Sequence, residues 1–328
     1  MRVAVSKDVF PLAKAFTISR GSKTEAVVVR VEIEQDGFVG QGECVPYARY
    51  GETVESVMTE IKKLPVPISR KAIQSSMPAG AARNAVDCAL WDLEARRSGK
   101  AVWQIAGLSA PKPEITAYTL SLDTPENMLA EAKENTSRPL LKIKLGGEGD
   151  IARIEAVRKG APNARIIVDA NEGWTSELYQ EIAPVLVKLG VEMVEQPFPA
   201  GDDDALLKLE RVLPVCADES CHDRSSLEDL QGKYDMINIK LDKTGGLTEA
   251  LALRELAREK GYLIMVGCMV GSSLAMAPAV LVAQDVEVTD LDGPLLLAED
   301  RANGLTYDTS HVHPPQSELW GASTNSPT

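Results

Sequence analysis

From about residue 115 onward, short apolar segments alternate with longer amphipathic stretches whose apolar positions recur with the period of a helix. Each apolar segment is short enough for one strand and nearly continuous, which is typical of strands buried on both faces of a parallel sheet. Eight such segments predict a closed barrel of fold class α/β. No helical pattern follows the eighth, so the last unit is expected to be truncated. The predicted strands are residues 115–122, 140–145, 165–171, 191–197, 214–220, 236–242, 262–268 and 287–292.

The first part of the chain has a different order of elements. Three segments with strand character come first, and two segments with helical periodicity follow them. Strands followed by helices, rather than alternating with them, predict a separate α+β domain. The predicted strands are residues 3–9, 25–34 and 38–44, and the predicted helices are residues 52–64 and 81–99.

The proline-rich sequence SAPKPE, residues 109–114, marks the expected junction between the two parts. We therefore predict an N-terminal α+β domain over residues 1–112 and a barrel over residues 113–298. The C-terminal tail, residues 299–328, is expected to pack back on the N-terminal domain.

The composition is that of an ordinary globular protein, with 44% hydrophobic and 25% charged residues. The formal net charge of −13 argues against nucleic acid and anionic membranes as partners, because both require a basic surface. The N-terminus lacks the apolar stretch of a secretory signal, and no apolar run approaches the roughly 18 residues of a transmembrane helix. We therefore expect a cytoplasmic protein. The five scattered cysteines contain no CxxC pair and indicate neither a disulfide framework nor a zinc site.

Three consecutive predicted strands end in an acid, namely Asp169, Glu195 and Asp218. The carboxyl ends of neighbouring strands in a parallel barrel meet at one rim, so these side chains are expected to converge. A single acid at a strand end is more often a helix cap or a loop residue, but three in register repel one another unless a cation lies among them. Hard oxygen ligands without histidine or cysteine suit Mg²⁺.

Two lysines, Lys142 and Lys144, share one face of the predicted strand LLKIKL because side chains on a strand alternate with a period of two. A solvated edge strand would explain the pair, but two adjacent ammonium groups in a partly dry site also lower each other's pKa. Lys240 lies at the corresponding end of the sixth predicted strand, which is opposite the second in an eight-stranded barrel.

This arrangement predicts a reaction at the α-carbon of a carboxylic acid bound to the metal. One lysine, Lys144 or Lys240, would remove the α-proton while the other delivers a proton to the opposite face, which inverts the stereocentre. The enediolate intermediate carries extra negative charge on oxygen, so a divalent cation stabilises it more than the starting carboxylate.

The KIK motif, the three acids and Lys240 resemble the enolase superfamily, specifically its muconate-lactonizing subgroup. The resemblance implies an α+β capping domain over a modified (β/α)₇β barrel, with lysine bases and Mg²⁺. Within the subgroup the chain is most similar to the dipeptide epimerases, typified by L-Ala-D/L-Glu epimerase. The resemblance therefore implies an isomerase that inverts the α-carbon of the C-terminal residue of a dipeptide. Relatives of this kind often form homo-oligomers.

The end of the eighth predicted strand, TDLDG, is similar to the family's Asp-x-Asp pair that holds the dipeptide's free ammonium. By this resemblance Asp290 and Asp292 would bind the ammonium, and both would point the same way on a strand. An ordinary acidic loop is the structural alternative.

The segment FTISRGSKTE, residues 16–25, occupies the place of the family's specificity loop. Arg20 there could bind a side-chain carboxylate of the substrate, although a solvated loop arginine remains the alternative. The resemblance also places Tyr50 near the mouth of the site, and Thr119 and Met269 among the substrate-binding residues. Met269 stands where many relatives carry a glutamate after the seventh strand.

Two other interpretations remain open. The same site could serve N-succinylamino acid racemisation, syn-elimination as in o-succinylbenzoate synthase, or cycloisomerisation. Asp290 and Asp292 distinguish a dipeptide epimerase from these alternatives, because an N-acylated substrate has no ammonium group for them to bind. A catalytically idle barrel that only binds a partner is the alternative from another class.

Overall fold

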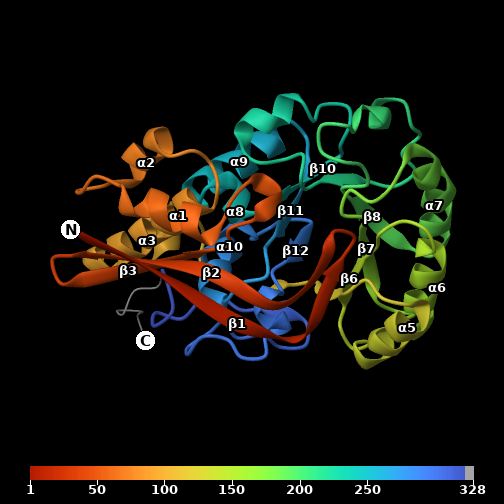
Figure 1. Ribbon diagram of the computed structural model, residues 1–328, viewed down its shortest axis with the longest axis horizontal. Helices are drawn as coiled ribbons and strands as arrows, with labels where there is room; N and C mark the ends of the chain where they lie inside the picture. The colour runs from red at the N-terminus through yellow and green to blue at the C-terminus, as the bar shows by residue number, and fades with distance from the viewer. Residues whose placement is uncertain (322–328) are drawn as a thin grey trace.

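The computed structural model describes residues 1–321, in which eight parallel strands form a barrel (Figure 1). Strands follow one another around the sheet in chain order, and a bridge between Thr116 and Thr289 brings the first strand region against the last. The predicted α/β barrel is therefore confirmed. The strands are β5 (Tyr118–Leu120), β6 (Leu140–Lys144), β7 (Arg165–Asp169), β8 (Val191–Glu195), β9 (Val215–Ala217), β10 (Met236–Ile239), β11 (Leu263–Gly267) and β12 (Val288–Asp290).

The strands are shorter than predicted, and one prediction was wrong. Residues 115–122 do not form one continuous strand. The backbone N–H groups of Thr116 and Ala117 donate to the carbonyl oxygens of Ser310 and Thr289 and interrupt the segment. The segment divides into β4 (Glu114–Ile115), which pairs with β13 (His311–Val312), and the barrel strand β5.

Helices cover the outside of the barrel between strands. They are α5 (Pro125–Glu134), α6 (Asp150–Gly160), α7 (Ser176–Lys188), α9 (Leu247–Glu259) and α10 (Ser273–Val282), whereas the single turn α8 (Leu241–Thr244) is buried directly after β10. Threonines whose side chains accept a backbone N–H cap α5 and α7, as expected for helix N-termini. Short 3₁₀ turns, η2 (Asp204–Leu207) and η3 (Arg224–Glu228), follow β8 and β9. Within residues 1–321, the one helical segment after β12 is the short 3₁₀ turn η4 (Gly293–Leu296), so the last unit is truncated as predicted.

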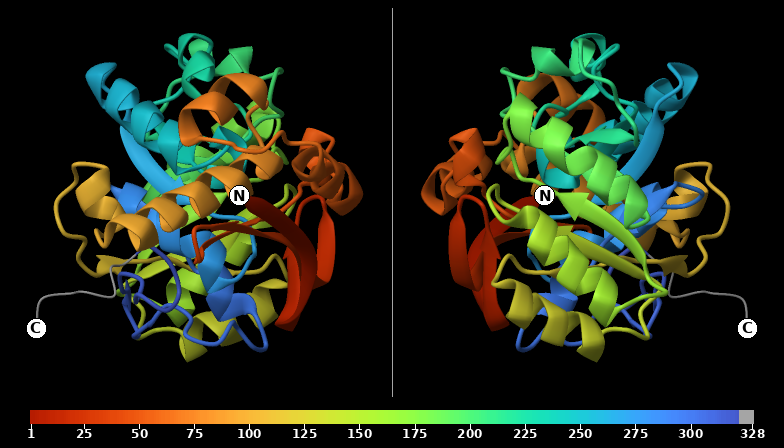
Figure 2. Two further views of the ribbon diagram at one scale, coloured as in Figure 1. Left: turned by 90° about the vertical axis from the view of Figure 1, so that its left-hand side faces the viewer. Right: turned by 90° about the vertical axis from the view of Figure 1, so that its right-hand side faces the viewer.

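The N-terminal part is an antiparallel sheet in the order β1-β2-β3, and the side views show it along one side of the barrel (Figure 2). Helix α3 packs against β3 at very short range. A Cβ atom at Gly42 would lie 2.1 Å from the carbonyl oxygen of Ala85, so only glycine allows this approach. The elements are β1 (Arg2–Ile18), β2 (Gly21–Gln35), β3 (Phe38–Cys44), η1 (Ala48–Tyr50), α1 (Val54–Lys62), α2 (Arg70–Ser76), α3 (Ala81–Ser98) and α4 (Val102–Ile105).

The segment expected to be a loop, residues 16–25, is the end of a long hairpin. Strands β1 and β2 remain paired to Ile18 and Gly21, which leaves Ser19 and Arg20 as the turn. In Figure 1 this tip reaches the barrel beside β6 and β7, and the backbone N–H of Leu122 donates to the carbonyl oxygen of Thr17 (3.0 Å). The hairpin therefore carries Arg20 from the N-terminal sheet to the mouth of the barrel.

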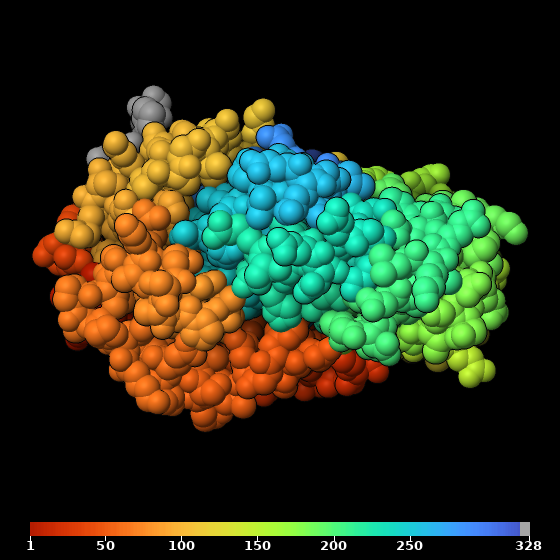
Figure 3. Space-filling model, turned by 90° about the horizontal axis from the view of Figure 1, so that it is seen from above, coloured from red at the N-terminus to blue at the C-terminus, as the bar shows by residue number. Residues whose placement is uncertain are grey.

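The N-terminal part and the barrel pack directly on each other, and the orange and cyan surfaces meet in Figure 3. Arg83 on α3 donates to the carbonyl oxygens of Thr244 (2.7 Å) and Gly245 (3.1 Å) after β10. The boundary near residue 112 stays a prediction.

The described part of the tail also contacts the N-terminal sheet and helix. Arg301 pairs with Asp8 (2.7 Å) and Glu43 (2.6 Å), and the indole N–H of Trp320 donates to the carbonyl oxygen of Cys88 (3.0 Å). The predicted tail extends to residue 328, and residues 322–328 lie outside the described residues. Within residues 1–321, every helix is too short or too polar to cross a membrane. The cytoplasmic location stays a prediction.

Candidate active site at the mouth of the barrel

The predicted lysines and acids lie together at the carboxyl ends of the barrel strands. Parallel pairing places Lys144 beside Asp169 and Asp169 beside Glu195. Asp218 follows the last residue of β9, and Lys240 follows the last residue of β10. All five side chains are buried, so the carboxylates and ammonium groups face one another in a region shielded from water.

Ion pairs join each lysine to particular carboxylates. Lys144 Nζ donates to Asp169 Oδ2 (2.6 Å), and Lys240 Nζ donates to Asp218 Oδ2 (2.7 Å). Since β6 and β10 are four strands apart in a ring of eight, these two ammonium groups approach from opposite sides of the barrel.

Lys142 occupies the centre of the acid cluster. Its Nζ lies 2.6 Å from Glu195 Oε2, 2.8 Å from Asp290 Oδ2 and 3.3 Å from Asp169 Oδ2. Burial lowers the pKa of Lys142, but the three carboxylates outweigh burial and hold that pKa well above its ordinary value. The expectation that the two KIK lysines lower each other's pKa was therefore wrong for Lys142, because it counted the neighbouring ammonium and not the facing acids.

The carboxylates respond to the same contacts. Burial alone would raise the pKa of Asp169 and Asp218, but the lysines beside them hold both pKa values below the ordinary range. Burial and the charge of Asp169 raise the pKa of Glu195 to about 7. Glu195 is thus the acid of the three with the least compensation from the lysines.

Within residues 1–321, no three histidine, cysteine, aspartate or glutamate side chains are arranged as a ready-made metal site. The lysine ammonium groups pair with the predicted ligands instead. The donor set nevertheless fits a hard divalent cation, because Asp169, Glu195 and Asp218 supply only carboxylate oxygens. Glu195 Oε2 is buried without a hydrogen-bond partner among the described residues, although the Lys142 ammonium lies 2.6 Å from it as an ion pair.

Two residues that the sequence did not single out hold the acids in place. Lys243 Nζ, fully buried, donates to both the carbonyl oxygen and Oδ1 of Asp218 at 2.6 Å. The side-chain amide of Asn238 donates to Glu195 Oε1 (2.7 Å). The sequence contained only a weak indication of these roles. Asn238 is a polar residue inside the buried strand MINI, and Lys243 follows Lys240 by three residues.

Asp290 and Asp292 are both buried, but they do not share a strand as predicted. Asp290 ends β12, whereas Asp292 lies beyond the strand at the start of η4 and accepts the backbone N–H of Thr119 (2.6 Å). Burial and the charge of Asp290 raise the pKa of Asp292 to about 6. Asp290 Oδ1 is buried without a hydrogen-bond partner among the described residues, so the pair favours an added cation. Thr119 itself pairs with Lys142 across β5 and β6.

Arg20 at the hairpin tip is bound to the barrel loops and is not a solvated loop residue. Nη1 donates to the carbonyl oxygen of Asn171 (2.9 Å) and to Glu172 (3.0 Å), and Nη2 donates to Tyr47 (3.2 Å) and Glu219 (2.6 Å). Asn171, Glu172 and Glu219 follow β7 and β9, which also carry predicted metal ligands.

Tyr50 and Met269 complete the set of predicted residues. The Tyr50 ring packs edge-on against Tyr47 and His222, and burial raises the pKa of its phenol far above the ordinary value. Met269 is half-buried in the loop after β11.

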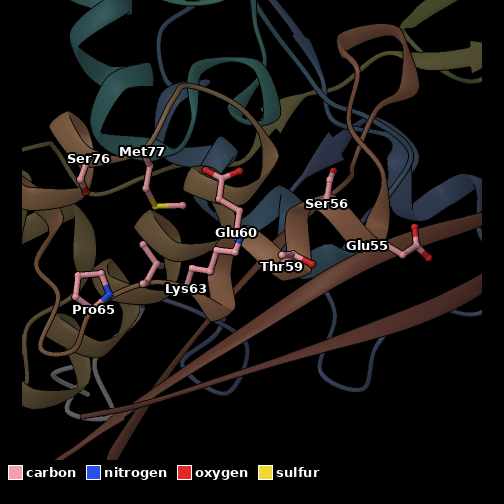
Figure 4. Close-up of a pocket in the computed structure, with 9 residues that line it drawn as sticks. Glu55, Ser56, Thr59, Glu60, Lys63, Pro65, Ser76 and Met77 are labelled. Atoms are coloured by element: carbon pink, nitrogen blue, oxygen red, sulfur yellow. The ribbon is translucent and has the colours of Figure 1, made fainter.

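A surface hollow of about 590 Å³ lies elsewhere, between α1 and α2 (Figure 4). Residues between 55 and 77 line it, including Glu60, Lys63 and Met77. None of the predicted site residues borders this hollow, so the chemistry does not lie there.

Two family models match the chain: Enolase C-terminal domain-like, over residues 127–321, and Mandelate racemase / muconate lactonizing enzyme, N-terminal domain, over residues 1–107. The chain belongs to the enolase superfamily. Similar superfamily members include L-Ala-D/L-Glu epimerase of Escherichia coli K12, 47% identical over 95% of this chain and 99% of that protein. N-acetyl-D-glutamate racemase of a Pseudoalteromonas species is 46% identical over 91% of this chain and 96% of that protein.

Solved structures of enolase-superfamily proteins agree with this assignment. A family member from Agrobacterium tumefaciens with homology to dipeptide epimerases contains sodium and L-Ala-L-Glu; it is 52% identical, with a TM-score of 0.95, and the match covers 97% of this chain and 99% of that one. Dipeptide epimerase of Enterococcus faecalis, complexed with Mg and L-Leu-L-Tyr, is 28% identical with a TM-score of 0.90, and the match covers 98% of both chains.

Proposed function

We propose that this protein is a Mg²⁺-dependent dipeptide epimerase acting on L-Ala-D/L-Glu or a similar dipeptide. The observation that carries the proposal is the approach of two lysines, Lys144 and Lys240, from opposite sides of one buried carboxylate cluster. Two facing bases are what inversion of a stereocentre requires. The relatives named as epimerases and the neighbour solved with Mg support the same reaction and cofactor.

In this proposal Asp169, Glu195 and Asp218 hold Mg²⁺, which supplies positive charge that stabilises the anion formed at the substrate carboxylate. Lys144 or Lys240, in its neutral form, takes the α-proton from one face. The other lysine, in its ammonium form, returns a proton to the opposite face. The C–H bond broken on one face is thus replaced by a C–H bond on the other face. The lysine that acted as base gains one proton, and the lysine that acted as acid loses one.

Asp290 and Asp292 would bind the free ammonium of the dipeptide. Two adjacent buried carboxylates repel each other, as the raised pKa of Asp292 records, and Asp290 Oδ1 has a free acceptor site. An ammonium group supplies both a charge and several N–H donors. The backbone N–H of Thr119 would position Asp292, and Tyr50 and Met269 are expected to border the bound substrate.

A second candidate is racemisation of an N-acylated amino acid on the same catalytic residues. The similarity to N-acetyl-D-glutamate racemase, at 46% identity, favours it. Such a substrate has no free ammonium, so Asp290 and Asp292 would gain no cation. This difference is the reason for preferring the dipeptide.

Exchange of the α-proton in D₂O tests both candidates. We expect the purified protein with Mg²⁺ to incorporate deuterium at the glutamate α-carbon of L-Ala-L-Glu and L-Ala-D-Glu, measured by proton NMR. Faster exchange into N-acetyl-D-glutamate than into either dipeptide would instead support the racemase. No exchange in any of the three would overturn the two-base proposal. Assembly into a homo-oligomer stays a prediction that light scattering would test.

A further inference from the structure

Gln196 follows Glu195 directly and lies where the chain leaves β8. The residue is fully buried, and its φ of 34° lies in a region that residues other than glycine seldom adopt. Backbone strain of this kind persists only where the surrounding structure fixes the conformation. Here the fixing contacts come from the strands on both sides of β8.

The side chain of Gln196 replaces a main-chain contact between β8 and β9. In a regular parallel ladder, a residue that donates its N–H to one residue of the neighbouring strand accepts the N–H two residues further on. The N–H of Gln196 donates to the carbonyl oxygen of Cys216 (2.9 Å), so its own carbonyl oxygen should accept from Asp218. That oxygen instead accepts the N–H of Glu172 (2.9 Å), and the side-chain Oε1 accepts the N–H of Asp218 (2.9 Å). The amide therefore continues the pairing past the end of the backbone ladder.

The same amide is anchored on its nitrogen side. Nε2 of Gln196 donates to the carbonyl oxygen of Phe198 (2.8 Å) and lies 2.9 Å from both Ser220 Oγ and the Tyr234 hydroxyl oxygen. The backbone N–H of Ser220 donates to Oε1 (3.1 Å), so backbone groups on both sides fix which end of the amide is the oxygen. Asp203 accepts from both hydroxyl groups at 2.7 Å. Gln196 cannot move without breaking several buried hydrogen bonds.

These contacts set the distance between two of the proposed metal ligands. Glu195 precedes Gln196 in the chain, and Asp218 is bonded to the Gln196 side chain through its backbone N–H. The carbonyl oxygen of Glu195 also accepts the N–H of Ala170 (3.0 Å), which follows the third proposed ligand, Asp169. Hydrogen bonds thus join the backbones that carry the three carboxylates, and Gln196 supplies the last ones between β8 and β9.

Rigid ligands distinguish Mg²⁺ from Ca²⁺. Mg²⁺ requires a nearly octahedral arrangement of oxygens at about 2.0–2.1 Å, whereas Ca²⁺ accepts variable arrangements at about 2.3–2.6 Å. We infer that Gln196 is a positioning residue that gives the site a preference for Mg²⁺ over Ca²⁺, because it prevents Glu195 and Asp218 from moving apart. This inference rests on the metal site of the proposed function.

The substitution Gln196→Met tests the inference, because it keeps the length of the side chain and removes both the acceptor and the donors of the amide. We expect the dissociation constant for Mg²⁺ to rise about 10- to 100-fold, as for loss of other residues that orient metal ligands. The dissociation constant for Ca²⁺ should change less than about twofold, because Ca²⁺ adapts to a wider spacing. Calorimetry with MgCl₂ and CaCl₂ on the full-length protein after chelation measures both constants without substrate, and circular dichroism checks the fold.

Two further variants make the result decisive. Gln180→Met makes the same exchange on the exposed face of α7, where the amide bonds Ser176 of its own helix, and should leave both constants unchanged. Tyr234→Phe removes one anchor of the Gln196 amide and should lower the preference for Mg²⁺ by about threefold, as for loss of one hydrogen bond. If Gln196→Met does not fold, Tyr234→Phe decides, and a preference equal to that of the wild type overturns the inference.

The possible failures are distinguishable. If Gln196→Met weakens Mg²⁺ and Ca²⁺ binding by the same factor, or weakens neither, the inference fails, and the proposed function stands as long as the wild-type protein exchanges the α-proton of L-Ala-L-Glu in D₂O. A wild-type protein that binds Ca²⁺ as tightly as Mg²⁺ also contradicts the inference. If the wild-type protein binds Mg²⁺ but exchanges no dipeptide proton, the proposed reaction fails, and the ratio of the two constants alone decides the inference. If it binds no Mg²⁺, both fail.

Discussion

At the scale of single residues, the site depends on which lysine faces which side of the substrate. Lys144 and Lys240 each pair with a different acid and lie on strands at opposite sides of the barrel. In the proposed mechanism neither could replace the other, because each would reach the α-carbon from one face only. The proposed mechanism therefore gives the two lysines separable roles.

Replacing either lysine should separate those roles. We expect Lys144→Ala and Lys240→Ala each to lower the rate of epimerisation by about 10²- to 10⁴-fold or more, since each removes one acid–base group. Each variant should still exchange the α-proton of one stereoisomer of L-Ala-D/L-Glu, and the two variants should retain opposite isomers. Proton NMR in D₂O measures both. Equal loss of exchange for both isomers in both variants would contradict the two-base mechanism.

Asn238 offers a test of the proposed metal site that removes none of its proposed ligands. Its amide orients Glu195, and supporting partners of this kind typically change metal affinity about 10- to 100-fold. We expect Asn238→Ala to weaken Mg²⁺ binding by that factor, measured by calorimetry, with the fold retained by circular dichroism. Asn127→Ala, on an exposed turn of α5, is the matched control. Unchanged Mg²⁺ affinity in Asn238→Ala would show that Glu195 needs no such support.

The lysines and acids could be found from the sequence because strand periodicity and strand ends fix where such side chains point. The residues that hold these side chains in place could not be found in this way. Lys243 in α8 contacts Asp218 after β9, and Asn238 in β10 contacts Glu195 at the end of β8, and neither residue's own segment indicates these partners. The predicted direction of the Lys142 pKa shift was wrong for the same reason, since the acids that raise this pKa come from three other strands.

At the scale of elements, the sequence predicted which elements exist better than where they end. The predicted strand 236–242 extends three residues past Ile239, where the strand ends, because Leu241 continues its pattern of buried positions; Lys240 is already the cap of α8. Apolar side chains are buried in barrel loops as well as in strands, so hydrophobicity does not mark the end of hydrogen bonding. The extent of the β1–β2 hairpin was underestimated, because residues 21–25 at the start of β2 are polar and exposed although they belong to a strand that pairs with β1.

The contact between α3 and β3 allows a test at this scale. Gly42→Ala places a Cβ atom 2.1 Å from the Ala85 carbonyl oxygen and 2.8 Å from the Ala89 nitrogen, so helix and strand must separate. We expect a loss of about 1–3 kcal/mol in the free energy of unfolding, measured with urea. Val39→Ala, at an exposed position of the same strand, should cost much less. A Gly42→Ala protein as stable as Val39→Ala would contradict the close packing.

At the scale of the whole molecule, the N-terminal part and the barrel meet through buried carboxylates. Asp242 in α8 accepts the backbone N–H of Val45 (3.0 Å) and the amide of Asn84 (2.8 Å), both from the N-terminal part. Asp87 of α3 accepts the backbone N–H of Thr248 (2.9 Å) across the same interface. Burial raises the pKa of Asp242 to about 7 and that of Asp87 to about 6. The contacts of these two acids could not be predicted from the sequence, because each acid looks like an ordinary helix residue on its own segment.

These raised pKa values predict how the stability of the interface depends on pH. An aspartate in an unfolded chain has a pKa of about 3.9, so between that value and the folded value the folded state holds a proton that the unfolded state has released. The free energy of unfolding then falls as pH rises, by up to about 1.4 kcal/mol per pH unit for each such group. For Asp242 the stabilisation is fully present below about pH 4 and is lost as pH rises through about 7.

Asp242→Asn removes the titrating group while keeping an oxygen that can accept the N–H of Val45. We expect the variant to lose less stability than the wild type between pH 4.5 and 7.5 and to equal or exceed it at the upper end, measured by urea unfolding at each pH. Asp229→Asn, exposed on the barrel surface, makes the same change in net charge and should retain the wild-type slope. If Asp242→Asn and the wild type lose stability in parallel, Asp242 is ionised in the folded protein throughout this range, and the interface is held by a buried carboxylate ion instead of a neutral acid.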